Sequence, residues 1–343
     1  MNILITGIHG FVGTNLVNAL KVQHTIYGLD IVSPPKVGVL KTFSWNELDQ
    51  LPLVDVIIHL AGKAHDTKNE TDAQVYFDIN TGLTEKIYDW FLNSGAKKFI
   101  FFSSVKAAAD KVEGILTEDV VPDPKGPYGE SKIKAENYIL SKEPPTPKGE
   151  EEKEQEPRTK NQEPRVKSQE VREALPTINY PLKKTYILRP CMIHGPGNKG
   201  NLNLLYQVVK KGIPYPLGAF ENRRSFTSVD NLSFVIGQLI ENDIPTGIYN
   251  VGDDETLSTN ELITLMANTL GKPNRIWKWN KTLILFAAKV GTLLHLPLNT
   301  ERLQKLTENY VVSNAKLKKA LGIEKMPVRA EEGLRKTISS INN

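Results

Sequence analysis

The sequence is poor in cysteine: its 343 residues include one, Cys191. A single thiol excludes an intramolecular disulfide and any cysteine-rich metal site, and the sequence predicts no bound metal. We interpret Cys191 as a small buried apolar residue. Because low cysteine usage is typical of a reducing compartment, we expect a cytoplasmic protein.

The chain also lacks a long uninterrupted hydrophobic run. It begins with the apolar stretch "NILITG", without the basic region and cleavage site of a secretory signal. The most apolar later stretch, residues 282–298, is interrupted by Lys289, His295, Gly291 and Pro297, so it predicts no integral membrane span. We expect a buried or lobe-packing helix there, and contact with a membrane surface is the second interpretation.

Charge of one sign is not in large excess. The chain has 43 Lys and Arg residues against 39 Asp and Glu residues, a formal net charge of +4 that is not concentrated on one element. This balance gives no support to nucleic-acid binding. The 40% hydrophobic content is sufficient for one large core or two lobes.

Short apolar runs alternate with helical patterns in the first half of the chain. These runs are almost continuously apolar, which is typical of parallel strands that are covered on both faces. Strands are predicted at residues 2–6, 24–30, 54–62, 97–104 and 183–190, and helices at 72–93 and 128–141. The pattern predicts an α/β fold, a doubly wound parallel sheet of the Rossmann type.

A glycine-rich turn follows the first predicted strand. The segment "TGIHGFVG" spaces Gly7, Gly10 and Gly13 three apart at the start of a helix that includes Phe11 and Val12. Such a turn lets the backbone approach a pyrophosphate and directs N–H groups and the helix dipole at its charge. The segment therefore predicts dinucleotide binding.

Asp30 stands at the end of the second predicted strand, where an acid binds the adenosine ribose hydroxyls. Its charge repels a 2′-phosphate, and no arginine follows it in "IVSPPK". NAD is therefore predicted in preference to NADP, and Lys36 weakens this preference without reversing it.

The domain prediction follows from these motifs. Residues 1–190 are expected to form the NAD-binding domain, and residues 191–343 mainly a smaller α+β lobe that binds the substrate, with 226–252 returning to the first domain. In the second lobe, Ser258 is predicted to cap a helix, with Glu261 three residues later.

Residues 142–176 interrupt this pattern. They are rich in Glu, Lys and Pro, and a seven-residue repeat within them contains Pro157 and Pro164. Because the repeat lacks apolar heptad positions and includes proline, it predicts a disordered surface insertion and not a coiled coil.

Tyr128 stands four residues before Lys132, so the predicted helix places both on one face. A tyrosine that acts as a base at neutral pH needs its pKa lowered by about three units, or roughly 4 kcal/mol. The charges of Lys132 and of oxidised nicotinamide are suited to lower it. Ser103 and Ser104 end a predicted strand, where such strands present residues to a ligand.

Taken together, these segments resemble the extended short-chain dehydrogenase/reductase superfamily, and within it the NAD-dependent nucleotide-sugar epimerase/dehydratase family. The resemblance extends along nearly the whole chain apart from residues 142–176. In family order, the matching segments are "TGIHGFVG", "DVIIHLAG", "FFSS", "PYGESK", "ILRPCMIHGPGNKGN", "RRSFTSVDN" and "YNVG". The resemblance implies an NAD cofactor, a UDP-sugar substrate and a homodimer.

The resemblance also implies a role for individual residues. The implied catalytic residues are Ser104, Tyr128 and Lys132. Residues implied in cofactor binding are Gly7, Gly10, Phe11, Val12, Gly13, Asp30, Leu60, Ala61, Gly62, Asn80, Ser103, Tyr128, Lys132 and Pro190. Residues implied in binding the nucleotide sugar are Ser104, Tyr128, Asn201, Arg224, Arg302 and Tyr310.

Some positions depart from the family pattern. Members that dehydrate sugars at C4 to C6 carry Asp-Glu directly after the active hydroxyl, because they must remove a C5 proton and protonate a leaving C6 hydroxyl. This chain has Val105 and Lys106 there, so a 4,6-dehydratase is not expected. His194 replaces a tyrosine that is common in the family, and packing and substrate contact both remain open for it. His59, inside an apolar strand, is predicted to be a core residue.

The predicted function is that of an NAD-dependent nucleotide-sugar 4-epimerase. It would act on a UDP-hexose or UDP-N-acetylhexosamine through a 4-keto intermediate, for surface polysaccharide synthesis. A UDP-4-keto-6-deoxy-HexNAc 4-reductase that uses NAD(P)H would need the same residues and stays open as the alternative. A non-catalytic NAD-sensing protein is a remoter alternative, because Tyr128 and Lys132 are both present.

Overall fold

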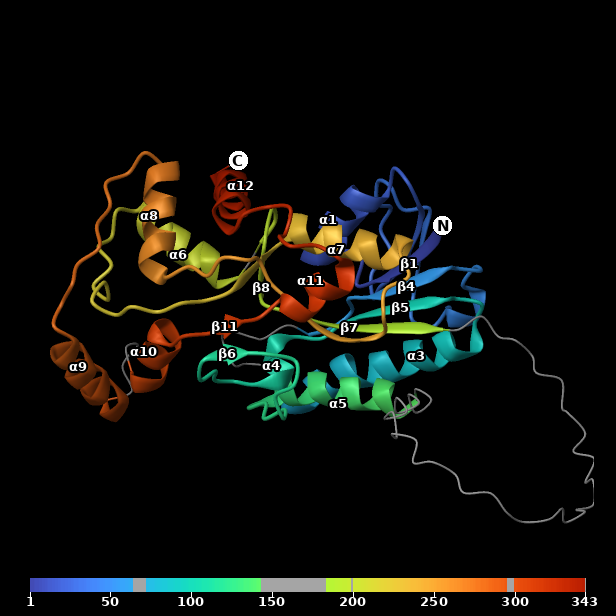
Figure 1. Ribbon diagram of the computed structural model, residues 1–343, viewed down its shortest axis with the longest axis horizontal. Helices are drawn as coiled ribbons and strands as arrows, with labels where there is room; N and C mark the ends of the chain where they lie inside the picture. The colour runs from blue at the N-terminus through green and yellow to red at the C-terminus, as the bar shows by residue number, and fades with distance from the viewer. Residues whose placement is uncertain (64–71, 143–182, 199, 295–298, 343) are drawn as a thin grey trace, which may run out of the picture.

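A parallel sheet of seven strands forms the centre of the molecule (Figure 1). The computed structural model describes residues 1–63, 72–142, 183–198, 200–294 and 299–342. Across the sheet the strands are β10 (Gly247–Val251), β7 (Lys184–Pro190), β5 (Lys98–Phe102), β4 (Val56–His59), β1 (Asn2–Thr6), β2 (Thr25–Leu29) and β3 (Lys41–Phe43). All neighbouring pairs are parallel, which confirms the predicted doubly wound α/β fold.

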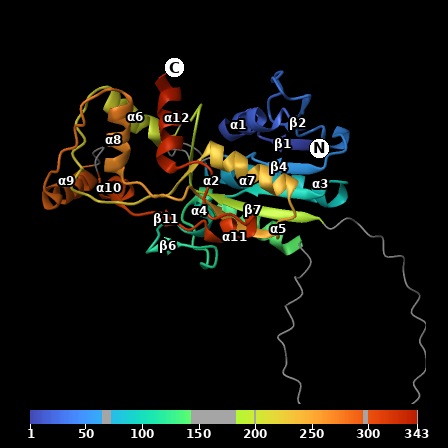
Figure 2. The same cartoon turned by 45° about the horizontal axis from the view of Figure 1, so that its top comes forward.

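Helices cover both faces of this sheet (Figures 1 and 2). One face carries α1 (Phe11–Leu20), α7 (Val229–Glu241) and α11 (Ala315–Leu321), and the other carries α3 (Leu83–Asn93) and α5 (Pro127–Lys142). Ile3 and Ile5 of β1 pack toward the first face, whereas Leu4 between them packs toward the second. Successive side chains of a strand point to opposite faces, so the continuous apolar runs of the sequence fill two cores.

The segment predicted as one helix at 72–93 is divided in three. It starts with α2 (Ala73–Tyr76), continues as a π-helical turn over Phe77–Gly82 and then becomes α3. The sequence analysis did not predict the π-helical turn, which contains Asn80. Turns of this kind are wider than α-helical ones and are frequent at functional sites.

A smaller lobe lies beyond one end of the sheet, and it is built mainly from the C-terminal third (Figure 1). Its core joins α6 (Asn201–Lys210), α8 (Thr259–Thr269) and α12 (Ala330–Asn342). Its other elements are α4 (Val105–Ala108), β6 (Ile115–Leu116), β8 (Met192–His194), β9 (Phe226–Ser228), α9 (Lys281–Leu293), α10 (Thr300–Thr307) and β11 (Val311–Val312). A 3₁₀ turn at Leu48–Gln50 lies near the sheet and does not belong to the lobe. The chain returns from the lobe to the sheet through α7 and β10. Residues 143–176 of the predicted insertion lie outside the described residues.

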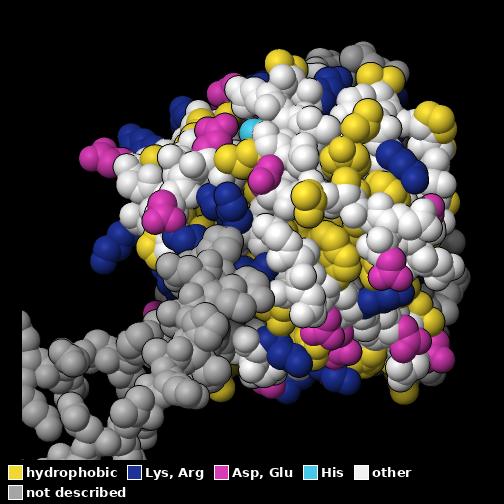
Figure 3. All heavy atoms as spheres, turned by 90° about the vertical axis from the view of Figure 1, so that its right-hand side faces the viewer, with side chains coloured by type: hydrophobic (Ala, Val, Ile, Leu, Met, Phe, Trp, Pro, Cys, Tyr) yellow, Lys and Arg dark blue, Asp and Glu magenta, His cyan; other side chains and the backbone are white. Residues whose placement is uncertain are grey.

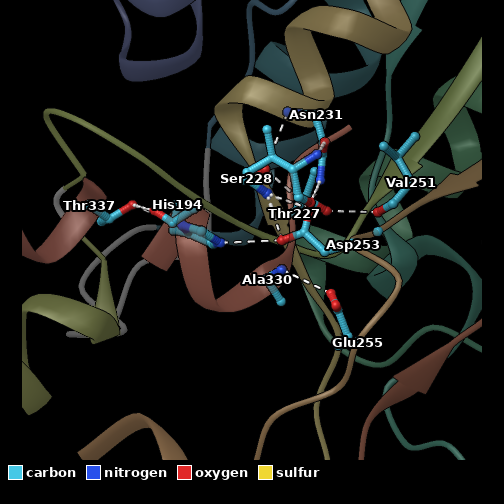
Figure 4. Close-up of polar contacts among 12 residues, drawn as sticks. His194, Thr227, Ser228, Asn231, Val251, Asp253, Glu255, Ala330 and Thr337 are labelled. Atoms are coloured by element: carbon cyan, nitrogen blue, oxygen red, sulfur yellow. Dashed lines mark hydrogen bonds and ion pairs between the residues drawn. The ribbon is translucent and has the colours of Figure 1, made fainter. Parts of the chain in front are cut away.

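A buried polar network joins the lobe to the sheet (Figure 4). The Asp253 carboxylate accepts hydrogen bonds from Ser228 N (3.0 Å) and Asn231 Nδ2 (2.7 Å) at the start of α7. His194 is fully buried, with Nε2 3.5 Å from Asp253 Oδ2 and Nδ1 2.9 Å from Thr337 Oγ1 of α12. His194 therefore packs between α12 and the sheet and lines no open surface.

Figure 3 shows the face at which β1 begins, where hydrophobic side chains gather in a band. At this amino edge of the sheet an apolar hollow of about 300 Å³ lies between the loop before β4 and the end of α3, lined by Leu51, Leu53 and Trp90 among others. Ligands of open α/β sheets bind at the opposite, carboxyl edge. The hollow is therefore separate from the candidate site.

Helix α9 (Lys281–Leu293) is the lobe-packing helix that the sequence predicted, and it is not a buried one. The helix forms within the predicted stretch, but of its residues Ile284, Ala288 and Gly291 are buried, and most of the others are exposed. The helix packs through a single stripe, which apolar periodicity cannot reveal when the opposite side is apolar too. Residues 295–298 lie outside the described part of the chain. Among the described helices, none has the length and apolar character needed to cross a bilayer.

The start of α8 confirms the predicted cap. Ser258 Oγ accepts from Glu261 N at 3.1 Å, and Glu261 Oε2 accepts from Ser258 N at 2.7 Å.

We predict that Ser258→Ala lowers the free energy of unfolding by about 1 kcal/mol in urea titrations, because an N–H of the first turn loses its acceptor. Ser258→Thr keeps the hydroxyl and serves as the control. Equal stability of the alanine variant and the parent would contradict this account.

Candidate functional site

The candidate site lies at the carboxyl edge of the sheet. Because all seven strands are parallel, their carboxyl ends meet at one edge, beside the smaller lobe (Figure 1). The glycine turn follows β1, Asp30 follows β2, Gly62 follows β4, and Ser104 follows β5. Segments that are distant in the sequence are thus brought together by the topology alone.

The glycine turn forms a tight cradle. Gly7 has φ +66°, and a Cβ there would lie 2.9 Å from Ala61 N. A Cβ on Gly13 would lie 2.7 Å from the carbonyl oxygens of Gly7 and Ile8. Gly10 is the N-cap residue of α1 and has no side chain to accept a hydrogen bond. The N–H groups of the first turn, including those of Phe11 and Val12, therefore receive no side-chain cap. This geometry fits a pyrophosphate.

The Asp30 carboxylate stabilises this turn as well as facing the edge. It accepts hydrogen bonds from His9 N at 2.9 Å and Ile31 N at 2.7 Å. Lys36 directs Nζ to Thr14 Oγ1 on α1 at 2.8 Å, and burial lowers the pKa of Lys36. The negative charge at the end of β2 fits a ribose with a free 2′-hydroxyl.

A chain of hydrogen bonds supports the loop after β4 from behind. Thr6 Oγ1 accepts from Leu60 N (3.1 Å) and Ala61 N (2.9 Å), so its own hydrogen is directed to His59 Nδ1, 2.7 Å away. The sequence analysis predicted His59 as a core residue, and its complete burial confirms this. The sequence did not reveal its polar role.

The same chain continues to the π-helical turn. With Nδ1 accepting, the proton of His59 lies on Nε2, which donates to Thr84 Oγ1 at 2.9 Å. Thr84 Oγ1 in turn donates to the carbonyl of Asn80 at 2.7 Å. Burial, followed by the charge of Lys132, holds the pKa of His59 well below its usual value. His59 is therefore a neutral bridge that holds two cofactor-facing segments.

Asn80 and Lys132 meet at Gly62. Asn80 Oδ1 accepts from Lys63 N at 2.8 Å, and Asn80 Nδ2 donates to Ser131 Oγ at 2.9 Å. A Cβ on Gly62 would lie 2.8 Å from Asn80 Oδ1 and 3.1 Å from Lys132 Nζ. The space over Gly62 is thus kept free by the absence of a side chain.

Tyr128 and Ser104 are hydrogen-bonded to each other. Burial raises the pKa of Tyr128, and the bond from Ser104 lowers it by less. The ring of Tyr76 lies edge-on, with its centroid 6.4 Å from that of Tyr128. The shift is opposite to the one that the sequence analysis required of a base, because burial disfavours a phenolate.

Lys132 lies one helical turn along α5, with Nζ donating to Phe102 O at 2.8 Å. Burial lowers the pKa of Lys132 to about 8, and the charge of Glu136 opposes this. The lysine is therefore held in place at the base of the site. No group of three or more His, Cys, Asp or Glu side chains arranged to hold a metal ion is found within the described ranges.

Below these residues lies a buried ion pair that the sequence analysis missed. The Arg189 guanidinium donates to Glu136 through Nη2 (2.6 Å) and Nε (3.0 Å), and Ser103 Oγ also bonds this carboxylate. Ser103 thus directs its hydroxyl into the protein, next to Pro190 at the end of β7. An acid four residues after Lys132 was the signal in the sequence, since it shares the same buried helix face.

Four residues of the lobe were predicted to bind the substrate, and the structure describes the side chains of two of them, Tyr310 and Arg224. Tyr310 Oη donates to Ala109 O (2.7 Å) and Val105 O (3.2 Å), next to Ser104. Arg224 pairs with Tyr310 through a β-bridge, and its guanidinium donates to Lys305 O and, at 3.4 Å, to Glu308 O. The side chains of Asn201 and Arg302 lie outside the description, although both residues start or lie within helices, α6 and α10.

Lys106, at the position of the acid that 4,6-dehydratases use, is held by Asp110. Its Nζ lies 2.7 Å from Asp110 O and 3.1 Å from Asp110 Oδ1. This ammonium has no capacity to accept a proton from a sugar carbon while it is charged.

Comparison with known proteins finds one matching family. Residues 3–143 match the NAD dependent epimerase/dehydratase family, over the segment that contains the glycine turn, Asp30, Ser104, Tyr128 and Lys132. This segment of the chain is similar to that family. Its description confirms the predicted enzyme class and NAD as the cofactor, and a reductase is also among the relatives.

Individual members of the family resemble the chain over most of its length. The UDP-glucose 4-epimerase of Vibrio cholerae is 29% identical, over 98% of this chain and 94% of the relative. The N-acetyl-alpha-D-glucosaminyl-diphospho-ditrans,octacis-undecaprenol 4-epimerase of Escherichia coli O157:H7 is 26% identical, over 79% and 73%. The structure of MoeE5 in complex with UDP-glucuronic acid and NAD has the same fold, with a TM-score of 0.70, 19% identity and coverage of 100% and 99%.

The His59 bridge generates a prediction. His59→Phe leaves the hydroxyls of Thr6 and Thr84 buried without their partner, and each unsatisfied group costs about 1–3 kcal/mol. We expect the free energy of unfolding to fall by roughly 2 kcal/mol or more in urea, and NAD to bind more weakly in calorimetry. His59→Gln retains a donor and an acceptor and should recover part of both losses. A His59→Phe protein with parental stability and NAD affinity would show that the bridge contributes nothing.

Proposed function

We propose that this protein is a UDP-sugar 4-epimerase that inverts the C4 hydroxyl of a UDP-hexose or a UDP-N-acetylhexosamine. The observation that carries the proposal is the hydrogen-bonded pair of Tyr128 and Ser104 at the carboxyl edge, with Lys132 one turn away. The glycine cradle and Asp30 support NAD binding directly beside this pair. The epimerase names of relatives that span most of the chain give further support.

In this proposal Tyr128 accepts the proton of the C4 hydroxyl and later returns it. NAD held by the glycine turn and Asp30 would supply an acceptor and then a donor of hydride, with which C4 would become a ketone and be reduced on its other face. Ser104 donates a hydrogen bond to the same oxygen and keeps it aligned. Lys132 is held by Phe102 O, the charge of Glu136 favours its charged form, and its positive charge favours the ionised phenol when Tyr128 gives up its proton.

We further propose that Asn201, Arg224, Arg302 and Tyr310 line the nucleotide-sugar site of the smaller lobe. An arginine suits the charge and geometry of a diphosphate, but Arg224 would first have to leave the carbonyl groups of α10. The division into residues 1–190 and 191–343, the homodimer, the cytoplasmic location and the role in surface polysaccharide synthesis belong to the same proposal.

The second candidate is a 4-ketoreductase, which the reductase among the relatives favours. It would use Ser104, Tyr128 and Lys132 identically but would consume reduced cofactor in each turnover. The two candidates differ in how they use the cofactor. An epimerase regenerates its NAD within each turnover and need not release it, whereas a reductase must exchange oxidised for reduced cofactor.

A Tyr128→Phe variant tests the catalytic proposal. Proton transfer by a positioned side chain contributes about 10²–10⁴-fold, so turnover of UDP-glucose or UDP-N-acetylglucosamine into the 4-epimer should fall by at least about 100-fold. Tyr76→Phe removes a hydroxyl from the neighbouring ring and is the matched control, for which we expect a change of less than about threefold. Unchanged turnover in Tyr128→Phe would refute the role of the phenol.

Cofactor release by heat separates the two candidates. NAD released from the purified protein, with interconversion of one UDP-sugar pair in the absence of added cofactor, is expected for the epimerase. A protein that binds no NAD and converts neither pair, but reduces a UDP-4-keto sugar with added NADH or NADPH, would instead be the reductase.

A further inference from the structure

Helix α9 and the segment before it carry an exposed apolar surface. We define the α9 surface as Trp277, Trp279, Leu283, Phe286, Leu293 and Leu294, all of which are exposed. The two tryptophan rings stack on each other, with centroids 6.2 Å apart and planes 18° apart, and each side chain is 49% exposed. Large aromatic side chains rarely stay in water in such a cluster unless something covers them.

The geometry of α9 shows why this surface points outward. Asn280 caps the helix, with Oδ1 accepting from Thr282 N at 2.8 Å. The buried residues Ile284, Ala288 and Gly291 follow the i, i+4, i+7 spacing of one stripe, which packs toward Leu217 and α10. Phe286 and Leu293, seven residues apart, lie on the opposite side and are 65% and 78% exposed. The helix is therefore apolar on the side that no described part of the chain covers.

The segment that carries this surface has positive charges and no negative ones. Residues 272–294 contain five basic residues, Lys272, Arg275, Lys278, Lys281 and Lys289, and no Asp or Glu. These charges are spread over a loop and a helix, so they form no cluster in the sequence itself. Lys289 lies between Phe286 and Leu293 on the exposed side of the helix, so positive charge and apolar surface are interleaved there. Lys278 stands between the two tryptophans in the sequence, in an extended segment that directs its side chain away from their stacked rings.

We propose that the α9 surface docks on a membrane that contains anionic lipids. Tryptophan and leucine side chains enter the boundary between headgroups and acyl chains, while lysine stems extend to the negatively charged headgroups. A second copy of this chain is the weaker occupant, since a two-fold interface on this surface would bring Lys281 and Lys289 of both copies together. This inference concerns a separate surface and does not rest on the sugar chemistry.

The position of α9 permits such docking. Figures 1 and 2 show α9 at the end of the molecule farthest from the N-terminus, with α10 beside it and the seven-stranded sheet toward the other end. Helix α10 supplies the carbonyl of Lys305 that holds Arg224. Docking through α9 would therefore hold the smaller lobe near the membrane and leave the NAD-binding edge in water.

Vesicle binding by the full-length protein tests the inference. We expect the protein to sediment with vesicles of phosphatidylcholine and phosphatidylglycerol but much less with phosphatidylcholine alone, and binding should weaken in about 1 M salt, where screening acts within about 3 Å. Trp277 and Trp279 should shift the fluorescence of the four-tryptophan chain to the blue. Phe286→Ser with Leu293→Ser should lower the partition coefficient at least about tenfold.

A matched double variant controls for a general loss of apolar surface. Val22→Ser with Leu53→Ser removes two side chains that are 87% and 84% exposed far from α9, and binding should not change. Lys278→Gln with Lys289→Gln should reduce binding only to the anionic vesicles. Sugar turnover in solution should persist in all three variants, which separates this inference from the proposed epimerase.

Three outcomes would overturn the inference. The parent protein fails to bind anionic vesicles, the Phe286→Ser and Leu293→Ser pair binds as well as the parent, or light scattering shows a dimer that this pair disrupts. The last outcome would assign the α9 surface to a second copy of the chain.

Discussion

The buried carboxylate of Glu136 is the group on which the arrangement of the site depends. It accepts hydrogen bonds from Arg189 of β7 and from Ser103 at the end of β5. Its own helix, α5, carries Tyr128 and Lys132. A carboxylate without partners in this position would cost several kcal/mol, so three elements must stay in register for the charge to be stable. The Tyr128 phenol is thereby fixed relative to the strand that presents Ser104.

A second constraint acts on the cofactor side. The glycine turn approaches the loop after β4 so closely that Gly7 leaves no room for a Cβ, and Thr6 binds two N–H groups of that loop. His59 extends this contact to the π-helical turn that carries Asn80. Thr6 and His59 form these hydrogen bonds inside the protein. The loop after β4 and the π-helical turn are therefore held in position without using the polar atoms that face the carboxyl edge and would bind a ligand.

Local patterns were sufficient to predict five of the seven strands of the sheet, all but β3 and β10, and to single out the residues that follow them at the carboxyl edge. The glycine spacing, Asp30 and the Tyr128–Lys132 pair each lie within a few residues of a strand or helix end, so sequence periodicity locates them. The Glu136–Arg189 pair spans 53 residues, and so does the Thr6–His59 bond, and neither is visible before the strands are paired. The sequence predicted that α9 packs on the lobe but not which side it buries, because apolar residues stand on both sides of the helix.

The electrostatics of Tyr128 link these constraints to reactivity. Burial raises the pKa of its phenol, and Lys132, with a pKa near 8, still carries most of its charge at neutral pH without reversing that shift. The chain alone therefore keeps Tyr128 protonated, and each unit by which its pKa must fall requires about 1.4 kcal/mol of favourable interaction. A further positive charge next to the phenol is the physical means of supplying it. The positive ring of oxidised NAD would be such a charge, and in the proposed function Tyr128 would become a better base only with the oxidised cofactor in place.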